Sequence, residues 1–248
     1  MPSFFHKFLI WIFTSLNLPI TIVPGTYKNV KKDRAAYRPF FNPWRSDKEF
    51  LDLYKKAKPF TTLFQPRLYN LYCLANTVLG QNGDVFECGV YRGGSAFVLA
   101  ELCRRHGTSP DRLHLFDTFG GMPVADSNLD GYSVGSFSDT SLESVQELLT
   151  ENPEINVHPG TIPETFKGLG ETKIRFAHID VDQYQSTKDC VEYIFPRLAI
   201  GGVMVIDDYG FPACYGAREA VDEYFKNRQE KPLALPTGQA VIWCYGNN

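Results

Sequence analysis

The fold is decided by residues 84–95, which read DVFECGVYRGGS. The first five residues are expected to form a strand, because apolar side chains predominate and a glycine bounds them on each side. Gly89, Gly93 and Gly94 follow, and glycine permits a tight turn and a close approach between the backbone and a ligand. A helix is expected from Ser95. This strand, turn and helix are typical of the opening unit of a doubly wound α/β domain.

The same alternation continues along the chain. Strands are expected at residues 84–88, 113–116, 155–158, 174–179, 203–206 and 240–245, and helices at 64–79, 95–106, 142–149, 187–198 and 217–228. A capping box from Thr140 to Glu143 is expected to open the helix at 142, and Ser186 to cap the helix at 187. Strands and helices that alternate in this way predict a mostly parallel, doubly wound α/β sheet. Residues 1–60 follow no regular period.

Composition limits the function classes. A chain of 248 residues suits one α/β domain with a small addition. The net charge of −3 argues against a basic face that binds nucleic acid. The six cysteines include no C-x-x-C pair, which argues against a zinc site and a disulfide framework. A reducing, cytoplasmic location is therefore expected.

The N-terminus offers two interpretations. Residues 8–23 are apolar-rich, but Thr14 and Pro19 interrupt them, and they fall short of the roughly 20 apolar residues that span a bilayer. Basic residues follow, so residues 4–38 could contact a membrane surface weakly. The alternative, which we favour, is a helix that packs on the domain or on a partner subunit.

Carboxylates follow four of the expected strands. In open α/β sheets, ligands bind outside the carboxyl ends of the strands, so these acids are expected at one rim. They are Glu87, Asp117, the pair Asp180 and Asp182, and the pair Asp207 and Asp208. Such a rim is suited to holding cations, hydroxyl groups, or both.

The first two acids indicate a nucleoside cofactor. The glycine spacing G-x-x-x-G-G differs from the dinucleotide pattern G-x-G-x-x-G, which argues against an oxidoreductase. Asp117, at the end of the second strand, is well placed to accept hydrogen bonds from ribose hydroxyls.

The later acids indicate a hard cation. If the segment stays extended, Asp180 and Asp182 point the same way, and Asp207 and Asp208 end the neighbouring strand. Oxygen ligands without a Cys or His cluster favour Mg²⁺. The alternative is a D-x-D that merely caps the next helix. His178 is given no role, because a strand histidine is more often a core residue.

Four segments together resemble the macrocin O-methyltransferase (TylF-type) family. They are FECGVYRGGS (86–95), LFDTFGGMP (115–123), IDVDQYQST (179–187) and VIDDYGFPAC (205–214), and the resemblance extends over residues 61–243. The family comprises class I S-adenosylmethionine-dependent enzymes that methylate sugar hydroxyls of natural products with Mg²⁺. The resemblance implies a seven-stranded Rossmann-like sheet in residues 61–248. Residues 1–60, outside the resemblance, are expected to form a helical extension that caps the substrate or an oligomer.

The resemblance also implies roles for individual residues. The cofactor, S-adenosylmethionine, would lie among Glu87, Gly89, Tyr91, Ser95, Asp117, Gly160 and Asp180. Mg²⁺ would be held by Asp180, Asp207 and Asp208, and Asp182 would be the general base. The expected partners are a small-molecule or glycan acceptor and a second copy of the chain in a homodimer.

Two alternatives remain open at this point. Asp180-Val-Asp182 is also a D-x-D that could hold Mn²⁺ and a nucleotide sugar in a glycosyltransferase. The chain could also be a catalytically silent methyltransferase-like subunit that binds a partner. The glycine-containing segment 120–139 has no clear period and is expected to be a lid over the site.

Overall fold

The computed structural model describes residues 42–109, 112–123, 129–151 and 154–246. Residues Pro43–Asn248 form one compact unit. The extension expected over residues 1–60 therefore overlaps this unit from residue 43 onward, and the expected membrane contact of residues 4–38 falls outside the described residues. Within the described ranges, no helix is both long enough and apolar enough to cross a membrane.

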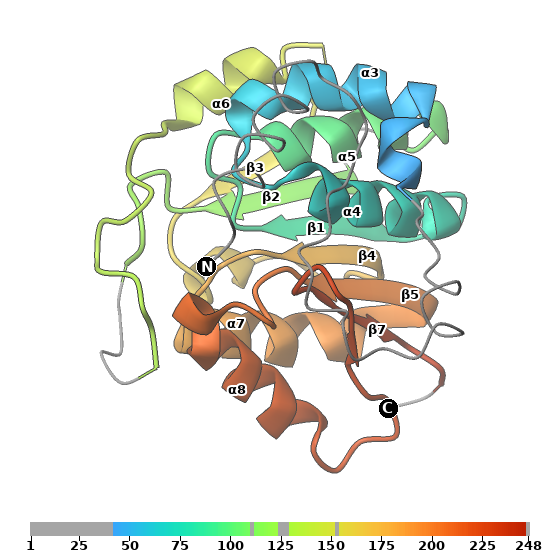
Figure 1. The fold of residues 1–248 in the computed structure, drawn as a ribbon. Coiled ribbons are helices and arrows are strands. Elements are labelled where there is room, and N and C mark those ends of the chain that lie inside the picture. Colours follow the sequence, from blue (N-terminus) through green and yellow to red (C-terminus); the bar gives the residue numbers. More distant parts are fainter. Residues whose placement is uncertain (1–41, 110–111, 124–128, 152–153, 247–248) are drawn as a thin grey trace, which may run out of the picture. The chain divides into compact units, whose positions relative to one another are not determined.

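The described residues contain a seven-stranded mixed sheet, in the order β3-β2-β1-β4-β5-β7-β6 (Figure 1). The first five strands in the chain run parallel, β7 pairs antiparallel with β5, and β6 pairs antiparallel with β7. The bounds are β1 Asp84–Cys88, β2 Leu113–Asp117, β3 Asn156–Pro159, β4 Ile174–Ile179, β5 Leu198–Ile206, β6 Leu233–Ala234 and β7 Ala240–Trp243. The mostly parallel, doubly wound sheet predicted from the sequence is confirmed.

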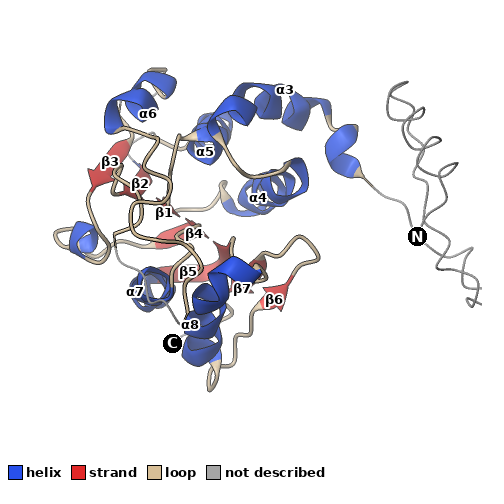
Figure 2. Ribbon diagram, turned by 60° about the vertical axis from the view of Figure 1, so that its left-hand side comes forward, coloured by secondary structure: helices blue, strands red, loops and turns tan. Residues whose placement is uncertain are grey.

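Helices cover both faces of the sheet (Figures 1 and 2). One layer contains α3 (Lys48–Ala57), α4 (Gln65–Val78), α5 (Gly94–Arg105) and α6 (Leu142–Leu148), and the other contains α7 (Tyr184–Ile194) and α8 (Tyr215–Phe225). Strand side chains alternate between the two cores: Val85 and Val205 pack toward the first layer, and Phe86 and Met204 toward the second. Burial on both faces is typical of parallel strands and fixes their register.

Several expected element ends are wrong. Helix α7 begins at Tyr184 with Gln183 as its N-cap, so Ser186 lies inside the helix rather than capping it. The helix ends at Ile194 because Pro196 follows in a short 3-10 turn. Strand β5 then begins at Leu198, earlier than expected, and includes the two glycines at 201–202.

The expected capping box is also displaced by one residue. Ser141 caps α6, and its side chain accepts from the Ser144 N–H while the Ser144 hydroxyl accepts from the Ser141 N–H. Thr140 instead donates to the Tyr91 carbonyl, and so ties the start of α6 to the turn after β1. Neither α3 nor the two-residue strand β6 was predicted from the sequence.

The β2–β3 edge contains a histidine pair that makes stability depend on pH. His114 Nδ1 lies 3.0 Å from His158 Nε2. Burial, followed by the charge of His114, lowers the pKa of His158 below its usual 6.5. The neutral imidazole is therefore favoured in the fold, and its stabilising contribution is lost as the pH falls from 6.5 toward the lowered pKa.

We therefore expect a change from about pH 7.5 to about pH 5.5 to lower the melting temperature of the wild type more than that of His158→Gln. Thermal unfolding followed by circular dichroism at both pH values checks this. Equal decreases in the two proteins would show that His158 does not carry the effect.

Candidate active site

A cavity of about 400 Å³ opens at the carboxyl ends of the central strands. It lies where chain connections leave β1 and β4 in opposite directions across the sheet, the usual ligand site of such folds. The predicted site residues that line it are Gly89, Tyr91, Ser95, Asp117, Gly160, Asp180, Asp182 and Asp208. Glu87 and Asp207 are not among the lining residues. The structure thus brings most of the predicted residues around one space.

The glycine turn after β1 is packed tightly against the end of β4. Gly89 has a φ of +87°, and a Cβ there would lie 1.9 Å from the backbone oxygen of Asp180. Its N–H donates to the Phe116 carbonyl at 2.9 Å. Tyr91, with a φ of 52°, continues the turn in the left-handed region. The glycine is therefore required both by the backbone angle and by the contact with β4.

Asp117 holds this turn from the end of β2. One carboxylate oxygen, Oδ2, accepts from the N–H groups of Val90 and Tyr91 at 2.7 and 2.8 Å. The other, Oδ1, accepts from the Phe119 N–H at 2.7 Å. A carboxylate has about four lone-pair sites, so one remains for a further donor. Asp117 thus shapes the turn and still faces the cavity, as its predicted contact with a hydroxyl requires.

Two further predicted cofactor residues lie beside this turn. Ser95 is buried in the first turn of α5, whose N-cap is Gly93 with a φ of 89°. Gly160 directly follows β3, and its N–H donates to the Asp117 carbonyl at 2.9 Å. Both residues line the cavity next to Asp117, so β1, β2 and β3 together form one wall.

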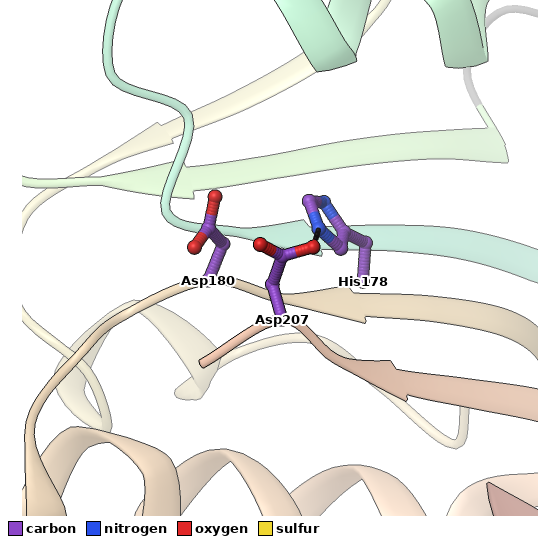
Figure 3. Close-up of side chains that lie close together, drawn as sticks. All are labelled: His178, Asp180 and Asp207. Carbon is purple, nitrogen blue, oxygen red and sulfur yellow. Dashed lines mark hydrogen bonds and ion pairs between the residues drawn. The ribbon is translucent and has the colours of Figure 1, made fainter. Parts of the chain in front are cut away.

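The opposite side of the cavity contains the later acids. Parallel pairing aligns Ile179 with Ile206, and the Asp207 N–H donates to the Ile179 carbonyl at 2.8 Å. Asp180 and Asp207 therefore follow adjacent strand ends, as Figure 3 shows together with His178. Within the described chain, ligand atoms of His178, Asp180 and Asp207 lie within 4.8 Å of one another, and those of Asp182, Asp208 and Cys214 form a second such group.

The sequence predicted that Asp180 and Asp182 lie on one extended segment, with their side chains pointing the same way. This prediction is wrong, because the segment is not extended at Asp182. Strand β4 ends at Ile179, and Asp182 adopts a left-handed conformation with a φ of 59°. The reason lies in its partners: the Asp182 N–H donates to Asp208 Oδ2 at 3.0 Å, and Cys214 Sγ donates to Asp182 Oδ1 at 3.2 Å. Burial and then the charge of Asp208 raise the pKa of Asp182 to about 7.

A fully buried histidine joins two of the predicted residues. His178 Nδ1 lies 2.9 Å from Glu87 Oε1, and its Nε2 lies 3.4 Å from Asp207 Oδ1. Gln239 Nε2 also donates to Asp207 Oδ1, at 2.6 Å. Glu87 thus contacts His178 rather than the cavity, and its contact with the cofactor stays a prediction. The sequence assigned no role to His178 or Gln239, because one strand histidine and one glutamine carry no pattern.

Arg67, in the first turn of α4, also belongs to the site but was not predicted from the sequence. Its Nη2 forms ion pairs with Asp207 Oδ2, with Asp208 Oδ1 at 3.5 Å and with Asp180 Oδ1 at 3.9 Å. The side chain is 10% exposed and lines the cavity. No local signal could have identified it, because its partners lie in distant segments of the chain.

The ion pairs of Arg67 indicate whether the predicted metal ligands are suited to bind a metal cation. Asp180, Asp207 and Asp208 each present one carboxylate oxygen to the same positively charged atom of Arg67. The three carboxylates therefore lie around the same guanidinium nitrogen, and carboxylate oxygens are the donors that Mg²⁺ prefers. Burial and the charge of Asp208 raise the pKa of Asp180 well above its usual range. The donor set suits a hard divalent cation.

The segment expected to be a lid contributes residues to the cavity lining in its described part. Met122, Tyr132, Ser136 and Phe137 line the space. Main-chain bonds join Gly131 N–H to the Ala213 carbonyl at 2.8 Å and Gly216 N–H to the Leu129 carbonyl at 2.9 Å. Asp130 Oδ1 accepts from the Tyr184 N–H at 2.8 Å, at the start of α7. The described end of this segment is therefore held against the starts of α7 and α8.

Comparison with known proteins identifies related sequences. The sequence model of a family described as macrocin-O-methyltransferase (TylF) matches residues 48–244. One relative, 8-demethyl-8-(2,3-dimethoxy-alpha-L-rhamnosyl)-tetracenomycin-C 4'-O-methyltransferase of Streptomyces olivaceus, is 32% identical over 192 residues, which cover 71% of this chain and 72% of that protein. Mycinamicin III 3''-O-methyltransferase of Micromonospora griseorubida is 31% identical over 179 residues, covering 66% and 69%.

A solved structure resembles this fold. The O-methyltransferase NovP is 23% identical and has a TM-score of 0.63, over 75% of this chain and 83% of that one. At this identity the likeness concerns the fold alone, which is the Rossmann-like fold of class I methyltransferases.

The contact between Gly89 and β4 leads to a prediction. Gly89→Ala is expected to destabilise the protein by more than about 2 kcal/mol, because a positive φ and a backbone overlap act together. Gly107→Ala is the matched control: Gly107 has a φ of +65° with nothing within 4 Å of a new Cβ, so we expect a cost of about 1 kcal/mol. Urea unfolding of both variants measures the difference. Equal costs would mean that the approach to Asp180 is not tight.

Proposed function

The chain belongs to the macrocin-O-methyltransferase (TylF) family, and we propose that it transfers a methyl group from S-adenosylmethionine to a hydroxyl of a sugar or a glycosylated small molecule. The names of the relatives support the acceptor class, since one is an O-methyltransferase of a rhamnosyl tetracenomycin. One observation carries the proposal: a single cavity has the Asp117-held glycine turn on one side and the acids of β4 and β5 on the other.

The glycine-turn side is the proposed cofactor site. S-adenosylmethionine, when bound, supplies the electrophilic methyl group. Gly89 and Tyr91 would allow close approach to the backbone, and the remaining lone pair of Asp117 would accept a hydroxyl of the nucleoside. Ser95 and Gly160 complete this wall. Asp180 lies at the junction with the acid side, where it is suited to contact the cofactor as well as a metal.

The acid side is the proposed site of acceptor activation. Asp180, Asp207 and Asp208 would hold Mg²⁺, which supplies positive charge that lowers the pKa of a neighbouring hydroxyl. The buried contacts of Asp207, a hydrogen bond from Gln239 Nε2 and the approach of the His178 imidazole, fix its orientation.

Asp182 is the proposed general base. Its Oδ1 already accepts from Cys214, which leaves the other oxygen for the proton of the acceptor hydroxyl. Burial and the charge of Asp208 raise its pKa to about 7, and a base with a pKa near the working pH accepts a proton efficiently. The aromatic and lid residues around the cavity exclude water and position the acceptor, a large part of the rate enhancement in such sites.

The two alternatives that the sequence left open, a glycosyltransferase and a catalytically silent subunit, lose support. Membership in a methyltransferase family argues against a nucleotide-sugar glycosyltransferase built on Asp180 and Asp182. A catalytically silent subunit would not need an acid with a raised pKa beside the cavity, and variants at Asp182 test this reading directly.

Asp182→Asn is expected to lower the rate of methyl transfer by about 10²- to 10⁴-fold, because the base is lost while the shape is kept. The assay follows release of S-adenosylhomocysteine with a panel of rhamnosides and nucleotide-linked sugars as acceptors. S-adenosylmethionine should still bind the variant.

The matched control is Asp189→Asn on α7, since Asp189 hydrogen-bonds Gln185 outside the cavity and should leave the rate unchanged. Full activity of Asp182→Asn would show that another group takes the proton. No turnover by the wild type with any acceptor in the panel would contradict the proposed sugar class.

Metal removal tests the second part of the proposal. Treatment with EDTA is expected to abolish transfer, and added Mg²⁺ to restore it, because the carboxylates alone cannot lower the pKa of a hydroxyl. Binding of S-adenosylmethionine is measured in the same samples by calorimetry. An unchanged rate after EDTA would refute the role of the metal and leave the cofactor site intact.

A further inference from the structure

Arg67 lies among the three predicted metal ligands. The carboxylate oxygens that face its Nη2 are Asp180 Oδ1, Asp207 Oδ2 and Asp208 Oδ1, one from each predicted ligand. Mg²⁺ lies about 2.0–2.1 Å from its oxygen ligands. An ion bound by these three oxygens would therefore come into contact with Nη2, and the two cations cannot use the same oxygens at once.

Core packing and hydrogen bonds hold Arg67 in its position. Helix α4 packs into the core through Leu68 and Leu71. Gln239 Nε2 donates both to the Arg67 carbonyl, at 3.2 Å, and to Asp207 Oδ1, so one side chain aligns the arginine with the acid. Asn70 Nδ2 in turn donates to Gln239 Oε1 at 2.9 Å. A connected network of hydrogen bonds therefore holds Arg67 beside the acids. Its ion pairs are not those of a surface side chain that lies near them by chance.

The guanidinium also has a second partner outside the acids. Its Cζ lies 4.3 Å from the centre of the Phe211 ring, and the ring of Phe64 lies 5.8 Å away. An aromatic face attracts a cation. Arg67 therefore keeps a favourable contact when its carboxylate partners are taken by another ion.

We propose that Arg67 is the resident cation of the acid cluster: it neutralises Asp180, Asp207 and Asp208 in the metal-free protein and competes with a divalent cation for their oxygens. The inference rests on the proposed function, because it concerns the metal proposed there. Removal of a competing positive charge strengthens the binding of a cation, whereas removal of a residue that only orders the ligands weakens it. The sign of the change in affinity thus separates competition from a structural role.

The test is a calorimetric titration of Mg²⁺ into protein that was stripped with EDTA and then desalted. Arg67→Met keeps much of the side-chain volume and removes the charge, and it is expected to bind Mg²⁺ at least tenfold more tightly than the wild type. Arg67→Gln removes the charge but keeps a polar side chain, and it serves as a second variant with the same expected gain if Arg67→Met does not fold.

Arg175→Met is the matched control. Arg175 is also buried, but it donates to the Leu79 carbonyl and to Thr108 Oγ1 rather than to the acid cluster. Its loss should leave Mg²⁺ affinity as in the wild type. Melting temperatures add a second readout: Arg67→Met should melt lower than the wild type in EDTA and recover in Mg²⁺, whereas Arg175→Met should melt lower in both.

The results of the Mg²⁺ titration distinguish a failure of the competition from a failure of the proposed function. Mg²⁺ binding that is equal or weaker in the Arg67 variants overturns the competition, even if the wild type binds the metal and is active. Tighter binding in these variants supports it, even if the wild type methylates no sugar. Absence of Mg²⁺ binding in every protein overturns both the competition and the proposed metal, while S-adenosylmethionine binding, measured in parallel, still tests the cofactor site.

Discussion

Repulsion between buried carboxylates is the constraint on which the arrangement of the acids after β4 and β5 depends. The parallel strands β4 and β5 end at the same edge and bring Asp180, Asp207 and Asp208 into one small volume. Burial disfavours the charged forms of Asp180 and of the nearby Asp182, and it raises the pKa of both carboxyl groups. The positive charge of Arg67 and the N–H groups around the acids offset this cost. Positive charge at the site therefore favours the ionised carboxylates.

The rest of the domain holds this arrangement in place. Strands β1 and β4 are buried along their whole length, and their close approach at Gly89 leaves no room for a side chain between turn and acid. Asp117 fixes the other side of the turn through the backbone N–H groups of Val90 and Tyr91. Because interiors are close-packed, a shift of one wall would be transmitted to the other. The glycine-turn side and the acid side of the cavity are thus positioned by the same few contacts.

Much of the fold could be predicted from the sequence because its signals are local. The apolar runs and glycine turns gave the order of strands and helices, and the rule for parallel sheets placed Asp117, Asp180 and Asp208 around one cavity. Element ends were less predictable. Ser186 resembles a cap, but α7 begins at Tyr184, whose N–H is taken by Asp130 from a distant segment.

The unpredicted parts of the site depend on tertiary contacts. The left-handed turn at Asp182 is supported by Asp208 and Cys214, which no periodicity reveals. Arg67 stands in a helix that is predicted from its apolar spacing alone, and only the folded chain brings it to the acids. Sequence motifs mark residues that bind a shared ligand, whereas the residues that neutralise and orient them are spread through the chain.

The most direct test of the account is a calorimetric titration of the wild-type protein with S-adenosylmethionine. We expect one site per chain with a dissociation constant on the order of micromolar, because the turn is already held in shape by Asp117. Absence of binding at millimolar concentrations, in EDTA as well as in Mg²⁺, would contradict the assignment of this cavity to the cofactor.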